Sequence, residues 1–99
     1  MVDTRMFKIT EMFEDEKTII LKVDGKLVGA GISLLKEECM KYKDNRQKTI
    51  LLDLSGVSYT DTNGVKMLES IKDENLQIIN CPMFIEALLK DLISINKGD

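Results

Sequence analysis

The segment that most constrains the fold runs from residue 50 to residue 64 and joins an apolar stretch to a cluster of polar residues. Four of its first five residues are isoleucine or leucine, a pattern typical of a central parallel strand covered on both faces. Ser55 and Gly56 are expected to end that strand. Residues 60–64 then supply capping side chains before apolar positions at helical spacing. The sequence therefore predicts a helix that begins near Thr62 and presents polar groups at its N-terminus.

Hydrophobic periodicity predicts further elements before this segment. Alternating apolar residues predict a half-exposed strand over residues 7–13 and a second strand over residues 19–23, which we expect to pair antiparallel with the first. Between residues 30 and 43, apolar positions three and four residues apart predict an amphipathic helix. The buried face of this helix is expected to carry Ile32, Leu35, Cys39 and Tyr42.

Strand and helix patterns continue to the end of the chain. Residues 50–54 predict the third strand, residues 62–73 the second helix, and residues 76–79 the fourth strand. Pro82 is tolerated in a first helical turn and favours a last amphipathic helix after it. The predicted order is β-β-α-β-α-β-α, and helices that connect parallel strands in this way form right-handed crossovers.

This order predicts the α/β fold class, with a mixed sheet of about four strands and helices packed on the sheet. The chain has 99 residues, of which 43% are hydrophobic. That length suits one hydrophobic core, and no linker or repeat interrupts the pattern. We therefore expect a single domain over residues 1–99.

Charge and hydropathy argue against several classes of partner. The net charge is −3, and lysines are interspersed with acidic residues instead of forming the basic face that nucleic-acid binding requires. No uncharged run approaches the roughly 18 to 20 residues that span a bilayer, and the N-terminus lacks the apolar region of a signal peptide. We expect a cytoplasmic protein that binds no nucleic acid and does not insert directly into a membrane.

Metal, cofactor and catalytic sites are also not expected. The chain has no histidine, and its two cysteines, Cys39 and Cys81, lack C-x-x-C spacing. Metal sites and nucleophile–histidine pairs depend on such residues. We therefore expect no catalytic residues, no metal and no cofactor, and we expect that the protein is not an enzyme. On the predicted helix face, Cys39 is expected to be a small buried hydrophobic residue.

Asp53, in the third predicted strand, has two interpretations. A receiver domain carries its phosphorylated aspartate at a similar place, but this chain is short for five β-α units and lacks the loop sequence that follows such an aspartate. Asp53 can instead accept hydrogen bonds from the backbone where the strand meets a turn. We favour this structural role.

Two motifs in the chain resemble the STAS domain family, which includes bacterial anti-sigma factor antagonists and domains attached to anion transporters. Residues 53–64 are similar to the family motif D-L-S-G-V-x-x-x-D-S-[ST]-G, with Thr62 as a conservative replacement. The matching residues are Asp53, Leu54, Ser55, Gly56, Val57, Asp61 and Gly64. Residues 21–28 resemble the family's second strand and its G-x-L-D turn, except that Val28 replaces the aspartate. On these motifs the chain is identified as a divergent member.

The resemblance implies a STAS-like fold and a protein-interaction module of the anti-sigma factor antagonist type, which acts in the signalling that regulates transcription. In that role, the helix start would bind a kinase-like anti-sigma factor of the GHKL type. The partner-binding residues would be Asp61, Thr62, Asn63 and Gly64. Asn63 occupies the position that the switching members phosphorylate, and an asparagine cannot accept a phosphate. The resemblance therefore implies a degenerate phospho-switch.

Thr62 and the identity of the partner each leave two interpretations. Thr62 is the candidate for phosphorylation, since a phosphate there would lie among free backbone N–H groups at the positive end of a helix. Hydroxyl residues at helix starts ordinarily serve as caps, so an unmodified first-turn threonine is the favoured interpretation. Family members that are accessory subunits of ABC-type lipid transporters carry D-T-x-G, as residues 61–64 do. A transporter subunit is therefore the alternative partner.

Overall fold

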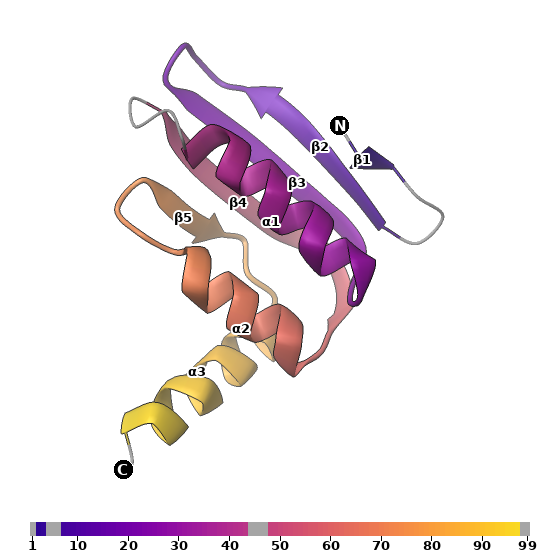
Figure 1. Ribbon diagram of the computed structural model, residues 1–99, viewed down its shortest axis with the longest axis vertical. Coiled ribbons are helices and arrows are strands. Elements are labelled where there is room, and N and C mark those ends of the chain that lie inside the picture. Colours follow the sequence, from indigo (N-terminus) through magenta and orange to yellow (C-terminus); the bar gives the residue numbers. More distant parts are fainter. Residues whose placement is uncertain (1, 4–6, 44–47, 98–99) are drawn as a thin grey trace.

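The computed structural model describes the backbone of residues 2–3, 7–43 and 48–97, and the side chains of residues 7–43 and 48–91. Its elements are β1 (Val2–Asp3), β2 (Phe7–Phe13), β3 (Thr18–Leu27), α1 (Ala30–Lys43), β4 (Thr49–Thr60), α2 (Thr62–Ile71), β5 (Leu76–Ile79) and α3 (Met83–Lys97) (Figure 1). The predicted order β-β-α-β-α-β-α is confirmed from β2 onward. The two-residue strand β1, which the sequence pattern does not predict, adds a fifth strand at one edge of the sheet.

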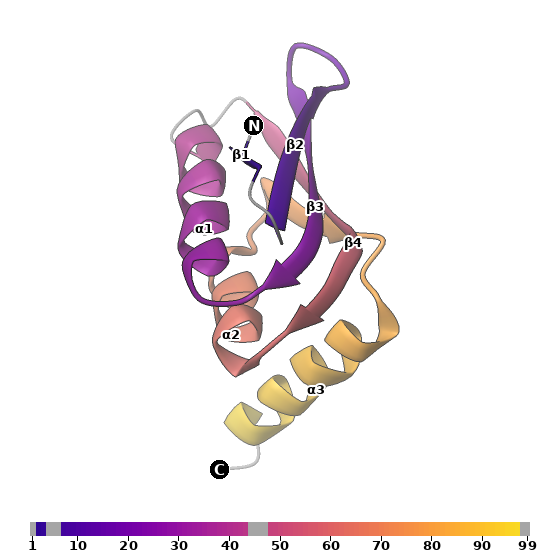
Figure 2. The ribbon, with the colours of Figure 1, turned by 90° about the vertical axis from the view of Figure 1, so that its right-hand side faces the viewer.

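The strands form one mixed sheet in the order β1-β2-β3-β4-β5. β2 pairs antiparallel with β1 and, as predicted, with β3, whereas β3, β4 and β5 are parallel. Figures 1 and 2 show α1 and α2 side by side on one face of this sheet. α3 packs against α2, at the end of the sheet where β4 leads into α2. This arrangement confirms the predicted α/β class.

Burial alternates along the strands because α1 and α2 cover the same face of the sheet. In β4, Ile50, Leu52 and Leu54 are fully buried, whereas Leu51 and Asp53 between them are only half-buried. The apolar run of this strand predicts burial on both faces, and that part of the prediction is wrong. Fully buried side chains from the other elements complete the core and include Ile9, Leu21, Leu35, Cys39, Leu68 and Ile71.

β4 is longer than the sequence predicts, because Ser55 and Gly56 do not end it. A Cβ atom added at Gly56 would lie 1.9 Å from Oδ1 of Asp24, next to a register shift between β3 and β4. Here glycine permits a close approach of the two strands instead of terminating one of them. Beyond this point β3 continues to Leu27, which pairs with Thr60 at the end of β4.

α1 has the predicted bounds and the predicted buried face. Leu35 and Cys39 are fully buried, and Ile32 and Tyr42 pack against the core as partly buried side chains. The spacing of apolar residues by three and four therefore identified the side of the helix that faces the sheet.

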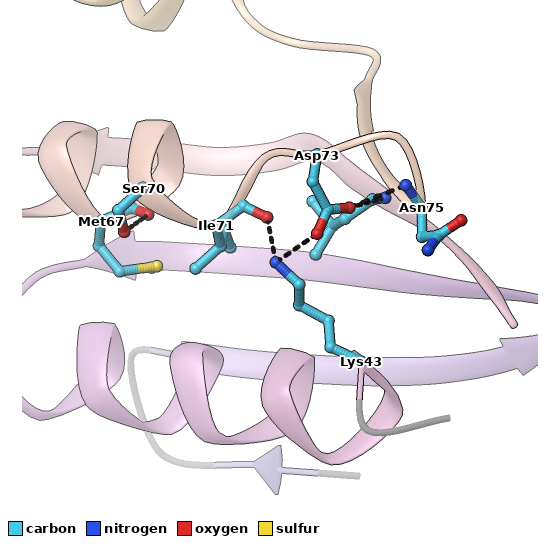
Figure 3. Close-up of polar contacts among 7 residues, drawn as sticks. Lys43, Met67, Ser70, Ile71, Asp73 and Asn75 are labelled. Atoms are coloured by element: carbon cyan, nitrogen blue, oxygen red, sulfur yellow. Dashed lines mark hydrogen bonds and ion pairs between the residues drawn. The ribbon is translucent and has the colours of Figure 1, made fainter. Parts of the chain in front are cut away.

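Lys43, the last residue of α1, connects α1 to the end of α2 (Figure 3). Its Nζ donates a hydrogen bond of 2.7 Å to the carbonyl oxygen of Ile71 and lies 2.9 Å from Oδ2 of Asp73. The other carboxylate oxygen of Asp73 accepts hydrogen bonds from the N–H groups of Asn75 and Leu76, at 2.8 and 2.9 Å. The resulting turn ends α2 at Ile71, earlier than the predicted end at residue 73.

Pro82 directly precedes α3, in agreement with the predicted helix start. Its carbonyl oxygen accepts hydrogen bonds of 3.0 Å from the N–H groups of Ile85 and Glu86. The side chain of Ile85 is fully buried and belongs to the core. None of the helices, over the residues that the structure describes, combines the length and the apolar character needed to cross a bilayer.

Candidate functional site

Asp61 caps α2 at the point where β4 gives way to the helix. Its backbone is extended, with φ −111° and ψ −175°, and its side-chain Oδ1 accepts a 3.0 Å hydrogen bond from the N–H of Gly64. Its carbonyl oxygen accepts the first helical hydrogen bond, from the N–H of Val65, also at 3.0 Å. The predicted capping role of Asp61 is therefore confirmed, and it holds the first turn of α2 in a defined conformation.

Thr60 and Gly64 pack the start of α2 closely against the end of β3. The buried hydroxyl of Thr60 donates a 2.8 Å hydrogen bond to the carbonyl oxygen of Leu27. A Cβ atom added at Gly64 would lie 2.0 Å from Oγ1 of Thr60 and 3.0 Å from the carbonyl oxygen of Leu27. Glycine is thus the residue that fits this contact. The sequence pattern counts Thr60 among the capping side chains of residues 60–64, whereas its hydroxyl binds the end of β3, and that partner is too distant in the sequence for the local pattern to indicate.

Thr62 and Asn63 occupy the first two positions of α2, and both are exposed to solvent. Because Asp61 supplies the capping oxygen, the Thr62 hydroxyl is not used as the N-cap. This geometry agrees with the interpretation of Thr62 as a solvent-exposed first-turn residue. The four predicted site residues thus divide into two that hold the helix start, Asp61 and Gly64, and two that it presents to solvent.

Other exposed side chains lie beside this helix start. Lys26 and Tyr59 are cross-strand partners near the ends of β3 and β4, and Tyr59 is 52% exposed. Lys66 is exposed one helical turn after Thr62. Val28, where the sequence lacks an aspartate, is half-buried in the connection to α1.

Asp53 organises a different part of the motif, upstream of the helix start. Its Oδ1 accepts a 2.9 Å hydrogen bond from the N–H of Ser55. Partial burial raises the pKa of the Asp53 carboxyl. Hydrogen bonds from Ser55 and Asn80 and the charge of Lys22 lower this pKa, and their combined effect is larger than that of burial. The pKa of Asp53 therefore lies below its ordinary value. The predicted structural role of Asp53 as a hydrogen-bond acceptor is confirmed, although β4 continues beyond Ser55 and no turn follows there.

Both cysteines lie in environments that suppress thiolate formation. Cys39 is fully buried, and this burial raises the pKa of its thiol to about 12. Cys81 is half-buried, and burial raises the pKa of its thiol as well. The thiolate is the nucleophilic form of cysteine. The packing of Cys39 therefore confirms the expectation of a small buried hydrophobic side chain.

A comparison with models of protein families identifies the family of this chain. The model of the STAS domain family matches residues 10–91 of the chain. The chain belongs to the STAS domain family. A search of curated proteins finds no match to the sequence.

This STAS domain is similar to solved structures of anti-sigma factor antagonists. One is the STAS domain of an antisigma-factor antagonist from Rhodobacter sphaeroides, with a TM-score of 0.57 and 17% identity over 77% of this chain and 88% of the other. Another is the anti-sigma factor antagonist SpoIIAA in its unphosphorylated form, with a TM-score of 0.59 and 12% identity over 93% of this chain and all of the other. At such identities the likeness establishes a shared fold.

Proposed function

We propose that this STAS domain is a non-enzymatic protein-interaction module of the anti-sigma factor antagonist type. It would bind a kinase-like anti-sigma factor through the helix start at residues 61–64 and thereby release a sigma factor. Membership of the family and the two antagonist structures with the same fold support this class of function. The location is proposed to be the cytoplasm.

The observation that carries the proposal is that Thr62 and Asn63 are exposed on a helix start held by internal contacts. Both side chains are exposed, while Asp61 caps the turn beneath them and Gly64 packs closely against Thr60. These two residues directly follow the connection from β4 to α2, and binding residues are often found where a stable scaffold positions such connections. Asp61 and Thr60 make the hydrogen bonds that hold the helix start in place. The exposed side chains of Thr62 and Asn63 are therefore available to contact a partner.

The phospho-switch of this module is proposed to be degenerate. Asn63 stands where the resemblance implies a phosphorylated residue, and its amide cannot accept a phosphate. The exposed side chain of Thr62 carries the one hydroxyl group within residues 61–64, and we propose that it stays largely unmodified.

The alternative function is that of an accessory subunit of an ABC-type lipid transporter. The combination of Thr62 with a non-phosphorylatable Asn63 favours this alternative, since the resemblance implies D-T-x-G in such subunits. Both functions use the same helix start, and they differ in the protein that binds there.

Affinity purification from the native cell tests the proposal and separates the two functions. Wild type is compared with Thr62→Asp, which adds one negative charge at the exposed helix start, and with Gln77→Glu, which adds the same charge at an exposed site on β5. We expect wild type and Gln77→Glu to retain a kinase-like anti-sigma factor and Thr62→Asp to lose it, with unchanged circular dichroism. Recovery of a permease and its ATPase would instead establish the transporter alternative, and full retention by Thr62→Asp would refute the binding surface.

A further inference from the structure

Asn63 and Gly64 form a pair of residues that is prone to deamidation. An asparagine side chain can react with the backbone nitrogen of the residue that follows it, and glycine obstructs this reaction least because it has no Cβ atom. Every other asparagine in the chain precedes a larger residue. The side chain of Asn63 is exposed, so water can reach it. The start of α2 therefore carries the asparagine most susceptible to this chemistry.

Packing fixes the glycine of this pair. A Cβ atom added at Gly64 would lie 2.0 Å from Oγ1 of Thr60 and 3.0 Å from the carbonyl oxygen of Leu27. The Thr60 hydroxyl is itself held by its 2.8 Å hydrogen bond to Leu27. The fold therefore requires a glycine directly after Asn63, and any protection of Asn63 has to come from elsewhere.

Deamidation of Asn63 takes two steps and consumes one water molecule. First, the backbone nitrogen of Gly64 loses its proton and attacks Cγ of Asn63. The new N–Cγ bond forms, the bond between Cγ and Nδ2 breaks, and the side-chain nitrogen leaves as ammonia with that proton. Water then opens the cyclic imide at either of its two carbonyl carbons, which leaves aspartate or isoaspartate. A neutral amide is thereby replaced by a carboxylate without any redox change.

The cap formed by Asp61 opposes the first of these steps in two ways. Oδ1 of Asp61 accepts, at 3.0 Å, the N–H of Gly64 whose proton has to leave. A hydrogen bond to the protonated form and a neighbouring negative charge both disfavour loss of that proton, and a carboxylate is too weak a base to remove it from a backbone amide. The cap also holds Asn63 in the first turn of α2, whereas ring closure needs a ψ far from the helical value of about −42°.

We propose that Asn63 is a deamidation site, and that the cap formed by Asp61 suppresses the reaction in the folded domain. Opening of the first turn of α2 removes both constraints, and helix ends open more readily than a protein core. The stability of this turn therefore sets the rate at which Asn63 becomes aspartate or isoaspartate. Each conversion adds a negative charge to the exposed helix start. The covalent state of position 63 does not depend on which partner binds there, so this site goes beyond the proposed function.

Incubation of the 99-residue chain in neutral buffer, followed by peptide mass spectrometry, measures aspartate and isoaspartate at position 63. We expect Asp61→Ala to deamidate roughly fivefold faster than wild type, the factor by which loss of an N-cap typically shifts a helix equilibrium. Wild type unfolded in urea should deamidate faster still. Asp61→Asn, which keeps an oxygen that can cap the helix, should deamidate more slowly than Asp61→Ala.

Asp73→Ala is the matched control for the loss of the cap. It also removes a carboxylate that accepts backbone N–H groups, but in the turn after α2, so the rate at Asn63 should stay close to that of wild type. Equal acceleration by Asp61→Ala and Asp73→Ala would overturn the local role of the cap, and slower deamidation in Asp61→Ala would identify Asp61 as a base instead. Equal rates in the folded and the urea-unfolded chain, including no reaction in either, would overturn the proposal altogether.

Discussion

A single glycine sets how closely α2 can approach the ends of β3 and β4. At Gly64 the position of a Cβ atom is taken by Oγ1 of Thr60, which itself is fixed by its hydrogen bond to Leu27. The glycine of the motif is therefore explained by packing, independently of any partner. The exposed residues Thr62 and Asn63 have no comparable packing role, and they are the part of the motif available for recognition.

Gly64→Ala should lower the free energy of unfolding by about 1–3 kcal/mol, because the added methyl group overlaps Oγ1 of Thr60. Urea denaturation measures the change. In Thr60→Ala/Gly64→Ala the overlapping oxygen is gone, so the loss should be smaller than the sum of the two single losses. Additive losses would mean that the contact with Thr60 does not determine the need for glycine.

Asn63 should carry no phosphate in protein isolated from its own cell, because its side chain has no acceptor hydroxyl. Peptide mass spectrometry measures modification at positions 62 and 63 separately. We expect at most a minor phosphorylated fraction at Thr62. Stoichiometric phosphate on Thr62 would contradict a degenerate switch and would indicate one shifted by a single residue.

At the scale of elements, two features fix the position of α1: its apolar face packs against the core, and Lys43 at its end binds the end of α2. Leu35 is fully buried beneath the helix, whereas Lys36 beside it is exposed. Lys43 connects α1 to the carbonyl of Ile71 and to Asp73, which organises the turn into β5 (Figure 3). The helices on the covered face are thus joined by packing and by the polar junction at Lys43.

Leu35→Ala should destabilise the domain by roughly 2–5 kcal/mol, since it leaves a cavity in the core. Lys36→Ala removes an exposed side chain on the same helix and should be nearly neutral. Thermal melting of the two variants beside wild type measures the difference. Equal shifts in melting temperature would contradict the orientation of α1.

Asp73 should make stability depend on pH. Hydrogen bonding and charge from Lys43 lower the pKa of the Asp73 carboxyl in the folded state below its ordinary value of 3.8, and backbone hydrogen bonds from Asn75 and Leu76 lower it further. A group with a depressed folded pKa stabilises the fold above its unfolded pKa, and this contribution disappears as pH falls through the folded value. Stability should therefore decrease as pH falls below about 4.

Asp73→Asn isolates the charge of this group, because an amide oxygen can still accept the backbone hydrogen bonds. We expect the variant to be less stable than wild type at neutral pH and to lose less stability on acidification. Denaturation curves at a series of pH values measure both effects. Parallel curves for the two proteins would show that the Lys43–Asp73 pair does not contribute to the pH dependence.

At the scale of the whole molecule, sequence patterns correctly predicted the features that depend on neighbouring residues in the chain. The bounds of α1 and the order of the elements follow from apolar spacing, and the cap follows from Asp61 and the residues after it. The length of β4 could not be predicted, because Gly56 continues the strand only when β3 approaches it at Asp24. The same limit applies to Thr60, whose partner Leu27 is distant in the sequence.

Site-specific photo-crosslinking in the native cell tests the binding surface most directly. A photoreactive phenylalanine analogue is introduced at position 63, on the exposed start of α2, and separately at position 77, an exposed site on the edge strand β5. We expect a defined crosslink to one protein partner from position 63 and no crosslink to that partner from position 77. Crosslinking of the partner from position 77 alone would contradict the assignment of the helix start as the binding surface.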